Sequence, residues 1–128
     1  MTTSSTGRAR VRYLVDDVGA AVEFYTAHLG FAVAKDAAPA FAAVARGSLE
    51  LLLSGSASSG ARATPAGART AGGNRIQLVV DDLRAEIDRL RAAGLSFSSE
   101  EISGPGGSQI LLADPSGNLV ELFQPAAR

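Results

Sequence analysis

The residues of this chain that could do chemistry are mainly carboxylates and arginines set within apolar segments. Glu50 interrupts the run LELLL and Glu121 the run LVELF, while Arg10 and Arg75 each open a strand-like segment. A carboxylate in such a place can act as a general base or form an ion pair with an arginine. Glu50 and Glu121 are therefore the candidate catalytic residues. The alternative is that both simply point into water from the open face of half-buried strands.

Several kinds of catalytic site are excluded by the residues that the chain lacks. It has no cysteine, and His28 is its only histidine. Thiolate chemistry, cysteine-based zinc sites, multi-histidine metal sites and histidine-dependent triads are therefore ruled out. His28 falls in the last turn of an expected helix, where an imidazole interacts favourably with the helix dipole. The glycines of residues 104–107 lack the order of a phosphate-binding loop.

Composition indicates a folded protein with no affinity for nucleic acid. The 128 residues are 46% hydrophobic and 20% charged, with a formal net charge of -1. Such a chain fits one compact unit and offers no basic patch for phosphate. The first residues lack a secretory signal, and no run approaches the roughly 20 apolar residues of a membrane span. We expect a cytoplasmic protein, and Lys35 as the only lysine among twelve basic residues suggests a bacterial gene of high GC content.

An internal repeat organises the elements that must position these residues. The sequence RVRYLVDDVGAAVEFYTAHLGF from Arg10 lines up with RIQLVVDDLRAEIDRLRAAGL from Arg75. Each copy contains an apolar strand, an Asp-Asp helix cap, a helix with an apolar stripe and a terminating glycine. The first helix is expected over residues 18–29.

Short strand-like pieces follow each helix, so each half is predicted to be a βαβββ module in an α+β fold. The expected strands after the helices cover residues 32–35, 41–45, 49–53, 96–102, 109–113 and 119–123.

A single domain is expected over residues 9–125, with module one at 9–54 and module two at 74–125. Residues 1–8 would be a disordered tail. Residues 55–73 are rich in Ser, Gly and Ala without a hydrophobic period, which predicts a linker loop that could also fold over a cavity.

Two motifs resemble a known family. VDDVGAAVEFYTAHLGF resembles the opening of a vicinal oxygen chelate module, and DPSGNLVELFQP resembles its closing strand. That superfamily includes glyoxalases, bleomycin-resistance proteins and extradiol dioxygenases. The resemblance covers residues 8–125 apart from the linker. It implies two tandem modules whose strands form a half-open, cup-shaped mixed sheet around a cavity, and a homodimer, because members often complete their cups across a subunit interface.

The resemblance also implies four inward positions that can bind a divalent metal. Residue by residue these former metal positions are Arg10, Glu50, Arg75 and Glu121, whereas metal-dependent relatives usually have His or Gln at the two arginine positions. A guanidinium stays protonated and has no lone pair for a metal. At about 4 Å and an effective dielectric of about 20, it would repel a divalent ion by roughly 8 kcal/mol. We expect no metal, no other cofactor, and salt bridges in its place.

The candidate ligand-binding residues are Arg12, Gln77, Leu52, Phe41 and Phe123. Arg12 and Gln77 occupy equivalent places in the two copies and, by strand alternation, face the same side as the implied metal positions. Both can donate hydrogen bonds, and the other three would supply an apolar wall. The alternatives are solvation for Arg12, which lies near the chain end, and core packing for the aromatic residues.

Three functions remain open. The resemblance favours a metal-free protein that binds a small apolar or aromatic molecule, as the drug-sequestering branch of the family does. The alternative is an enzyme of the same superfamily: a metal-free isomerase, lyase or cyclase with a cavity glutamate as base, or a diverged glyoxalase- or dioxygenase-like metalloenzyme. A neighbouring arginine favours the ionised, weakly basic form of a carboxylate, which counts against catalysis. The third is a structural or regulatory dimer whose cup is blocked.

Overall fold

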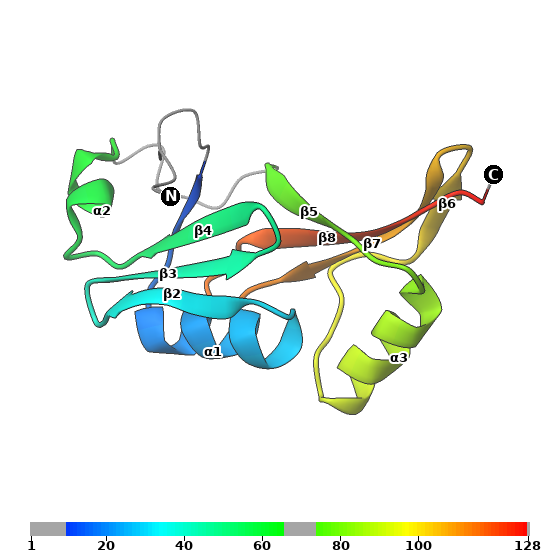
Figure 1. The fold of residues 1–128 in the computed structure, drawn as a ribbon, viewed down its shortest axis with the longest axis horizontal. Coiled ribbons are helices and arrows are strands. Elements are labelled where there is room, and N and C mark those ends of the chain that lie inside the picture. Colours follow the sequence, from blue (N-terminus) through cyan, green and yellow to red (C-terminus); the bar gives the residue numbers. More distant parts are fainter. Residues whose placement is uncertain (1–9, 66–73, 128) are drawn as a thin grey trace, which may run out of the picture. The chain divides into compact units, whose positions relative to one another are not determined.

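The computed structural model describes residues 10–65 and 74–127, which form two four-stranded mixed sheets with a few helices (Figure 1). The chain divides into two compact units, Met1–Arg69 and Thr70–Arg128. The predicted α+β class and the tandem βαβββ arrangement are confirmed. The expected disordered tail at residues 1–8 lies outside the described residues.

In the first unit the strands lie in the order β1-β4-β3-β2, with β1 parallel to β4 and the other pairs antiparallel. Their bounds are β1 Val11–Leu14, β2 Ala32–Ala37, β3 Phe41–Arg46 and β4 Leu49–Ser54. Helix α1, Val18–His28, lies against one face of this sheet (Figure 1). Leu51 and Leu53 are fully buried and alternate with Glu50, as expected for a strand with one face on the core.

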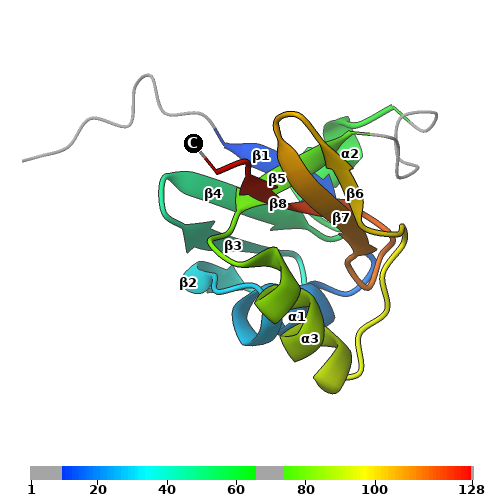
Figure 2. The ribbon, with the colours of Figure 1, turned by 90° about the vertical axis from the view of Figure 1, so that its right-hand side faces the viewer.

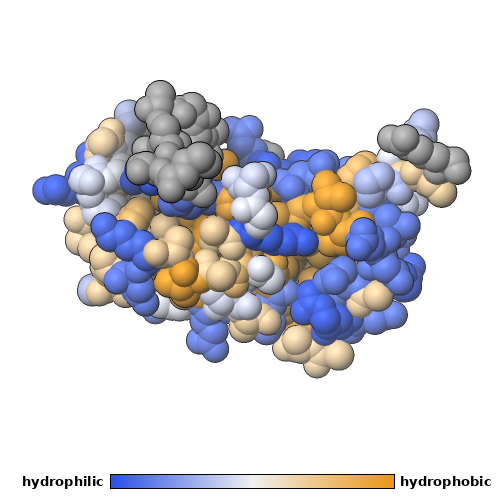
Figure 3. Space-filling view, in the orientation of Figure 1, coloured by the Kyte–Doolittle hydropathy of each residue, from blue (hydrophilic) through white to orange (hydrophobic). Residues whose placement is uncertain are grey.

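In the second unit the order is β5-β8-β7-β6, again with one parallel pair, and helix α3 lies to one side of the sheet (Figure 2). The bounds are β5 Arg75–Val79, α3 Leu83–Ala92, β6 Ile102–Gly104, β7 Gly107–Ala113 and β8 Leu119–Pro125. Helix α3 buries Leu83, Ile87 and Leu90, and its outer face is hydrophilic (Figure 3). This apolar stripe is the one predicted from the sequence.

The second aspartate of each Asp-Asp pair caps the helix that follows. Asp17 Oδ1 accepts a hydrogen bond from the Ala20 amide at 3.0 Å. Asp82 Oδ1 accepts one from the Ala85 amide at 3.1 Å. Each bond satisfies a donor that the first helical turn leaves without a partner, so the predicted caps are confirmed.

Helix α2, Ser59–Ala63, lies within residues 55–73, where we expected a linker loop with no helix or strand, and so corrects that expectation for residues 59–63. Residues 66–73 of the expected loop lie outside the described residues. Ser58 caps it: its Oγ accepts a hydrogen bond from the Ala61 amide at 3.1 Å and donates one to the Gly55 carbonyl at 2.7 Å. A helix of five residues is too short to show a hydrophobic period, so only the capping serine could have indicated it.

The strand expected over residues 96–102 is also corrected, because β6 covers only Ile102–Gly104. The Ser98 amide donates to the Leu111 carbonyl at 2.7 Å, and Ser99 Oγ accepts from the Leu111 amide at 3.0 Å. The Ser99 hydroxyl thus takes the place of the backbone carbonyl that a continued ladder would supply.

No helix in the described part of the chain is long and apolar enough to cross a membrane.

Candidate functional site

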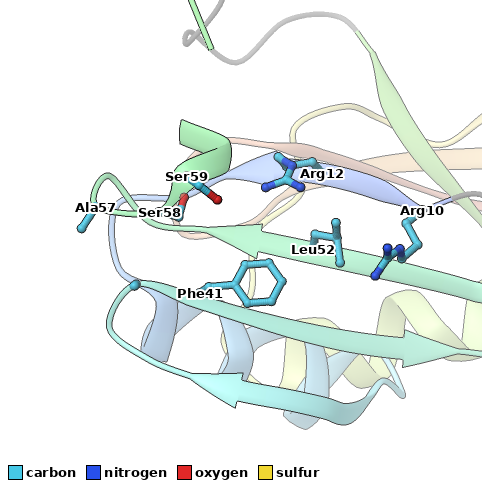
Figure 4. Close-up of a pocket in the computed structure, with 8 residues that line it drawn as sticks. Arg10, Arg12, Phe41, Leu52, Ala57, Ser58 and Ser59 are labelled. Carbon is cyan, nitrogen blue, oxygen red and sulfur yellow. The ribbon is translucent and has the colours of Figure 1, made fainter. Parts of the chain in front are cut away.

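A hollow of about 400 Å³ opens on the face of the first sheet away from α1 (Figure 4). It lies wholly within the first unit. Its walls come from β1, β3, β4 and the segment that leads into α2. The lining residues are Arg10, Arg12, Ala40, Phe41, Leu52, Ala57, Ser58 and Ser59.

Strand register explains why these residues meet. Arg12 on β1 lies opposite Leu52 on β4, and Leu52 lies opposite Ala43 on β3. The next row on the same face pairs Ser54 with Phe41. Residues opposite each other in a sheet point to the same side, so one basic, one aromatic and one aliphatic side chain share this hollow. The structure therefore brings together three of the five candidate ligand-binding residues.

The guanidinium of Arg12 is fixed at one end of the hollow. Its Nη1 donates a hydrogen bond of 3.0 Å to Oγ of Ser54, which is fully buried. Figure 4 shows the side chain extending from β1 toward α2, with Leu52 and Phe41 on the neighbouring strands. Arg12 is an exposed residue, and its guanidinium has no carboxylate partner in the parts of the chain that the structure describes. Its remaining N–H groups can reach a ligand.

Arg10 and Glu50 form a looser pair at the edge of the same hollow. Arg10 Nη1 lies 3.5 Å from Glu50 Oε1, and the Arg10 side chain is 52% exposed. Although the Glu50 side chain is only 14% exposed, a pair at this distance with an exposed arginine contributes little to stability. It does balance the charge of Arg10, so Arg12 supplies the net positive charge of the hollow.

Glu121 in the second unit is buried and satisfied on both oxygens. Arg75 Nε donates to its Oε1 at 2.9 Å, and Gln77 Nε2 donates to its Oε2 at 2.7 Å. The Glu121 side chain is only 7% exposed. Phe123 is part-buried two residues further along β8, opposite Val79. The predicted salt bridges form, Arg10 with Glu50 in the first unit and Arg75 with Glu121 in the second. Strand register nevertheless makes Leu52, and not Glu50, the counterpart of Glu121.

The two units differ at equivalent points of their strands. The residue opposite Gln77 is Glu121, but the residue opposite Arg12 is Leu52. Glu121 accepts hydrogen bonds from Arg75 and Gln77 of β5, whereas its counterpart beside Arg12 is the apolar Leu52. This exchange makes the hollow of the first unit apolar and positively charged.

The residues at the former metal positions do not fit a divalent ion. Both oxygens of Glu121 already accept hydrogen bonds, and Arg75 and Arg10 have no lone pair to give. No group of three or more His, Asp or Glu side chains that could hold a metal occurs within residues 10–65 and 74–127.

Comparison with known proteins identifies the family. The model of the Glyoxalase/Bleomycin resistance protein/Dioxygenase superfamily matches residues 7–122. The chain belongs to this superfamily. A search of curated proteins gave no match.

Solved structures show the same fold over nearly the whole chain of this superfamily member. Lactoylglutathione lyase from Agrobacterium tumefaciens has a TM-score of 0.76 at 20% identity and covers 93% of each chain. The antibiotic binding protein TnmS3 from Streptomyces sp. CB03234 has a TM-score of 0.67 at 23% identity, over 98% of this chain and 99% of that one. The fosfomycin resistance protein FosX from Listeria monocytogenes has a TM-score of 0.69 at 14% identity, over 96% and 94%.

Sequence reasoning missed Ser54 and the residues around α2 that complete the hollow of this glyoxalase-superfamily chain. Ser54 follows Leu52 by two and so shares its face, a signal that alternation could have given. Ser58 and Ser59 lie in the segment predicted to be a linker, where only a serine suited to cap a helix could have indicated α2. Gln77 and Phe123 belong to the second unit, and their contact with a ligand stays a prediction.

Proposed function

We propose that this superfamily member is a metal-free protein that binds a small, largely apolar molecule carrying a negatively charged or hydrogen-bond-accepting group. One observation carries the proposal: the Arg12 guanidinium lies in a hollow together with Phe41 and Leu52. Mostly apolar walls with a few placed polar groups are typical of small-molecule sites.

The size and charge of the hollow agree with such a ligand. Its volume of about 400 Å³ falls within the usual range for pockets that take small molecules. A charge-assisted hydrogen bond from Arg12 contributes roughly 1.5 to 3 kcal/mol, and burial of an aromatic ring contributes about 25 cal/mol per Å². These gains offset the cost of association well enough to give roughly micromolar affinity.

The state of the two candidate catalytic glutamates favours binding over catalysis. A base must accept a proton from the substrate, yet each oxygen of Glu121 already accepts a bond from Arg75 or Gln77. One oxygen of Glu50 already faces Arg10 Nη1 at 3.5 Å. The enzyme alternative would require these contacts to be broken before reaction.

Names of structural neighbours lend support to both classes of function. TnmS3 is described as an antibiotic binding protein, and lactoylglutathione lyase is an enzyme. Because the first is a binder built on the same fold, the fold itself does not demand catalysis. We prefer the binding function because the guanidinium of Arg12 lies in the hollow.

Titration calorimetry of wild type and Arg12→Ala against a panel of aromatic carboxylic acids and polyketide-like compounds tests the proposal. We expect roughly 10- to 150-fold weaker binding by Arg12→Ala, the equivalent of one charge-assisted hydrogen bond. The matched control is Arg84→Ala, which removes an exposed arginine paired with Glu101 in the other unit and leaves affinity unchanged. Equal affinity of wild type and Arg12→Ala would reject the role of Arg12, and turnover of the ligand detected by mass spectrometry would favour the enzyme.

A further inference from the structure

The backbone of α2 approaches Arg12 so closely that residue 60 has no room for a side chain while Arg12 keeps its position. A Cβ added at Gly60 would overlap Arg12 Nη1 and would lie 2.6 Å from Arg12 Cζ and 3.0 Å from its Cδ. The guanidinium therefore occupies the volume that the side chain of any other residue at position 60 would take. Figure 4 shows Arg12 directed toward this short helix.

The start of α2 is anchored to the rest of the first unit. The Gly55 amide donates to the Ala40 carbonyl at 2.9 Å, and Ser58 Oγ donates to the Gly55 carbonyl at 2.7 Å. Ser58 Oγ also accepts from the Ala61 amide within the helix. These bonds hold α2 where it flanks the guanidinium, with Ser54 Oγ bonded to Nη1.

Helix propensity does not account for a glycine at this position. Alanine is a better helix former than glycine, by about 1 kcal/mol in a helix interior, and Gly60 lies in the first turn of α2. The backbone of Gly60 is not in the left-handed region that favours glycine. The close approach of Arg12 is the feature that requires it.

We propose that Gly60 is a positioning residue for Arg12. It allows α2 to lie against the guanidinium and so holds Nη1 on Ser54 and directs the remaining N–H groups at the hollow. The inference rests on the proposed function, because the guanidinium is the group expected to bind the ligand. It adds a residue that touches no ligand yet sets where the charge is presented.

Substitution of Gly60 separates this role from a structural one. The added methyl group of Gly60→Ala meets the far end of a flexible arginine, which can swing away, and alanine is the better helix former. We therefore expect an unchanged or slightly raised melting temperature together with lost affinity. A merely structural glycine would instead show lost stability.

The experiment is a double-mutant cycle of wild type, Gly60→Ala, Arg12→Ala and the double variant, with 2-naphthoate as the probe in calorimetry. We expect Gly60→Ala to weaken binding nearly as much as Arg12→Ala, and the double variant to show no further loss, because both changes remove the same contact. The matched control is Gly106→Ala, where a Cβ would meet nothing within 4 Å. Ser54→Ala, which removes the other anchor of the guanidinium, is expected to weaken binding in the same direction.

The outcomes distinguish failure of this inference from failure of the proposed function. If Gly60→Ala binds like wild type while Arg12→Ala does not, the inference is wrong and the proposed function stands. If Arg12→Ala binds like wild type, or if wild type does not bind, the proposed function is wrong. A crystal structure of Gly60→Ala then decides the inference alone: Arg12 still bonded to Ser54 overturns it, and a displaced guanidinium supports it. The same structure decides the case if Gly60→Ala proves less stable than wild type.

Discussion

Arg12 and Gln77 occupy equivalent places in the two units but have different neighbours on the partner strand. Alternation correctly predicts that each shares a face with the arginine two residues before it. It does not say which residue lies opposite on the partner strand, because register depends on turn geometry and on the packing of the whole sheet. The sequence thus predicted the salt bridge of Glu121 with Arg75 but not its second bond, from Gln77, nor the bond of Arg12 to Ser54.

Glu121→Ala is expected to destabilise the fold by about 1 to 3 kcal/mol, because it leaves Arg75 and Gln77 without their acceptor in a largely buried place. Urea unfolding followed by circular dichroism measures the change. The control is Glu101→Ala, which breaks an exposed pair with Arg84 and should alter stability by less than about 0.5 kcal/mol. Equal effects of the two substitutions would contradict the arrangement around Glu121.

Arginine at two of the four former metal positions predicts that the protein binds no divalent metal there. Protein expressed in metal-replete medium and analysed by mass spectrometry for zinc, nickel, manganese and iron is expected to contain well under one ion per chain. Stoichiometric metal that survives gel filtration would overturn this expectation.

Among the helices and strands, local sequence patterns predicted the two longer helices and most strands. They failed for elements whose position depends on contacts within the folded unit. The Asp-Asp caps and apolar stripes of α1 and α3 are local, so their positions could be read from the sequence. Residues 96–101 resemble a strand in composition, but they meet Leu111 of β7 through the Ser98 amide and the Ser99 hydroxyl and not through a regular ladder, which begins only at Ile102. Helix α2 depends on a serine cap and on anchoring to Ala40, which no periodicity reveals.

Removal of either aspartate cap tests whether these local patterns stabilise the helices. Asp17→Ala and Asp82→Ala are each expected to cost about 1 kcal/mol, since each removes one helix-capping hydrogen bond of the same geometry. The control is Asp81→Ala, next to the second cap, with an expected change below about 0.5 kcal/mol. Chemical denaturation measures all three, and a larger loss for Asp81→Ala than for Asp82→Ala would show that the cap is misassigned.

For the whole molecule, the repeat in the sequence was enough to predict two modules of one kind. The superfamily was predicted from the resemblance of two motifs, and the family model confirms it. Function needed the differences between the copies. Arg12 lies opposite Leu52 in the first unit, whereas Gln77 lies opposite Glu121 in the second, and the absence of a carboxylate opposite Arg12 leaves it available to a ligand. A comparison of whole sequences does not reveal that, because it aligns motifs and not strand registers.

The family resemblance also predicts a homodimer, since related chains often pair to complete their cups. Light scattering coupled to gel filtration at micromolar concentration is expected to give about twice the chain mass of 13.0 kDa. A mass that stays at one chain over a hundredfold range of concentration would count against it.

The central claim is that the hollow beside Arg12 is the ligand site. Its most direct test is a nuclear magnetic resonance titration of ¹⁵N- and ¹³C-labelled protein with 2-naphthoate. We predict the largest shifts at the Arg12 side-chain Nε–H, the Leu52 methyl groups and the Phe41 ring, with the same affinity from each. Saturable shifts confined to residues outside the hollow, or no shifts at millimolar ligand, would contradict the claim.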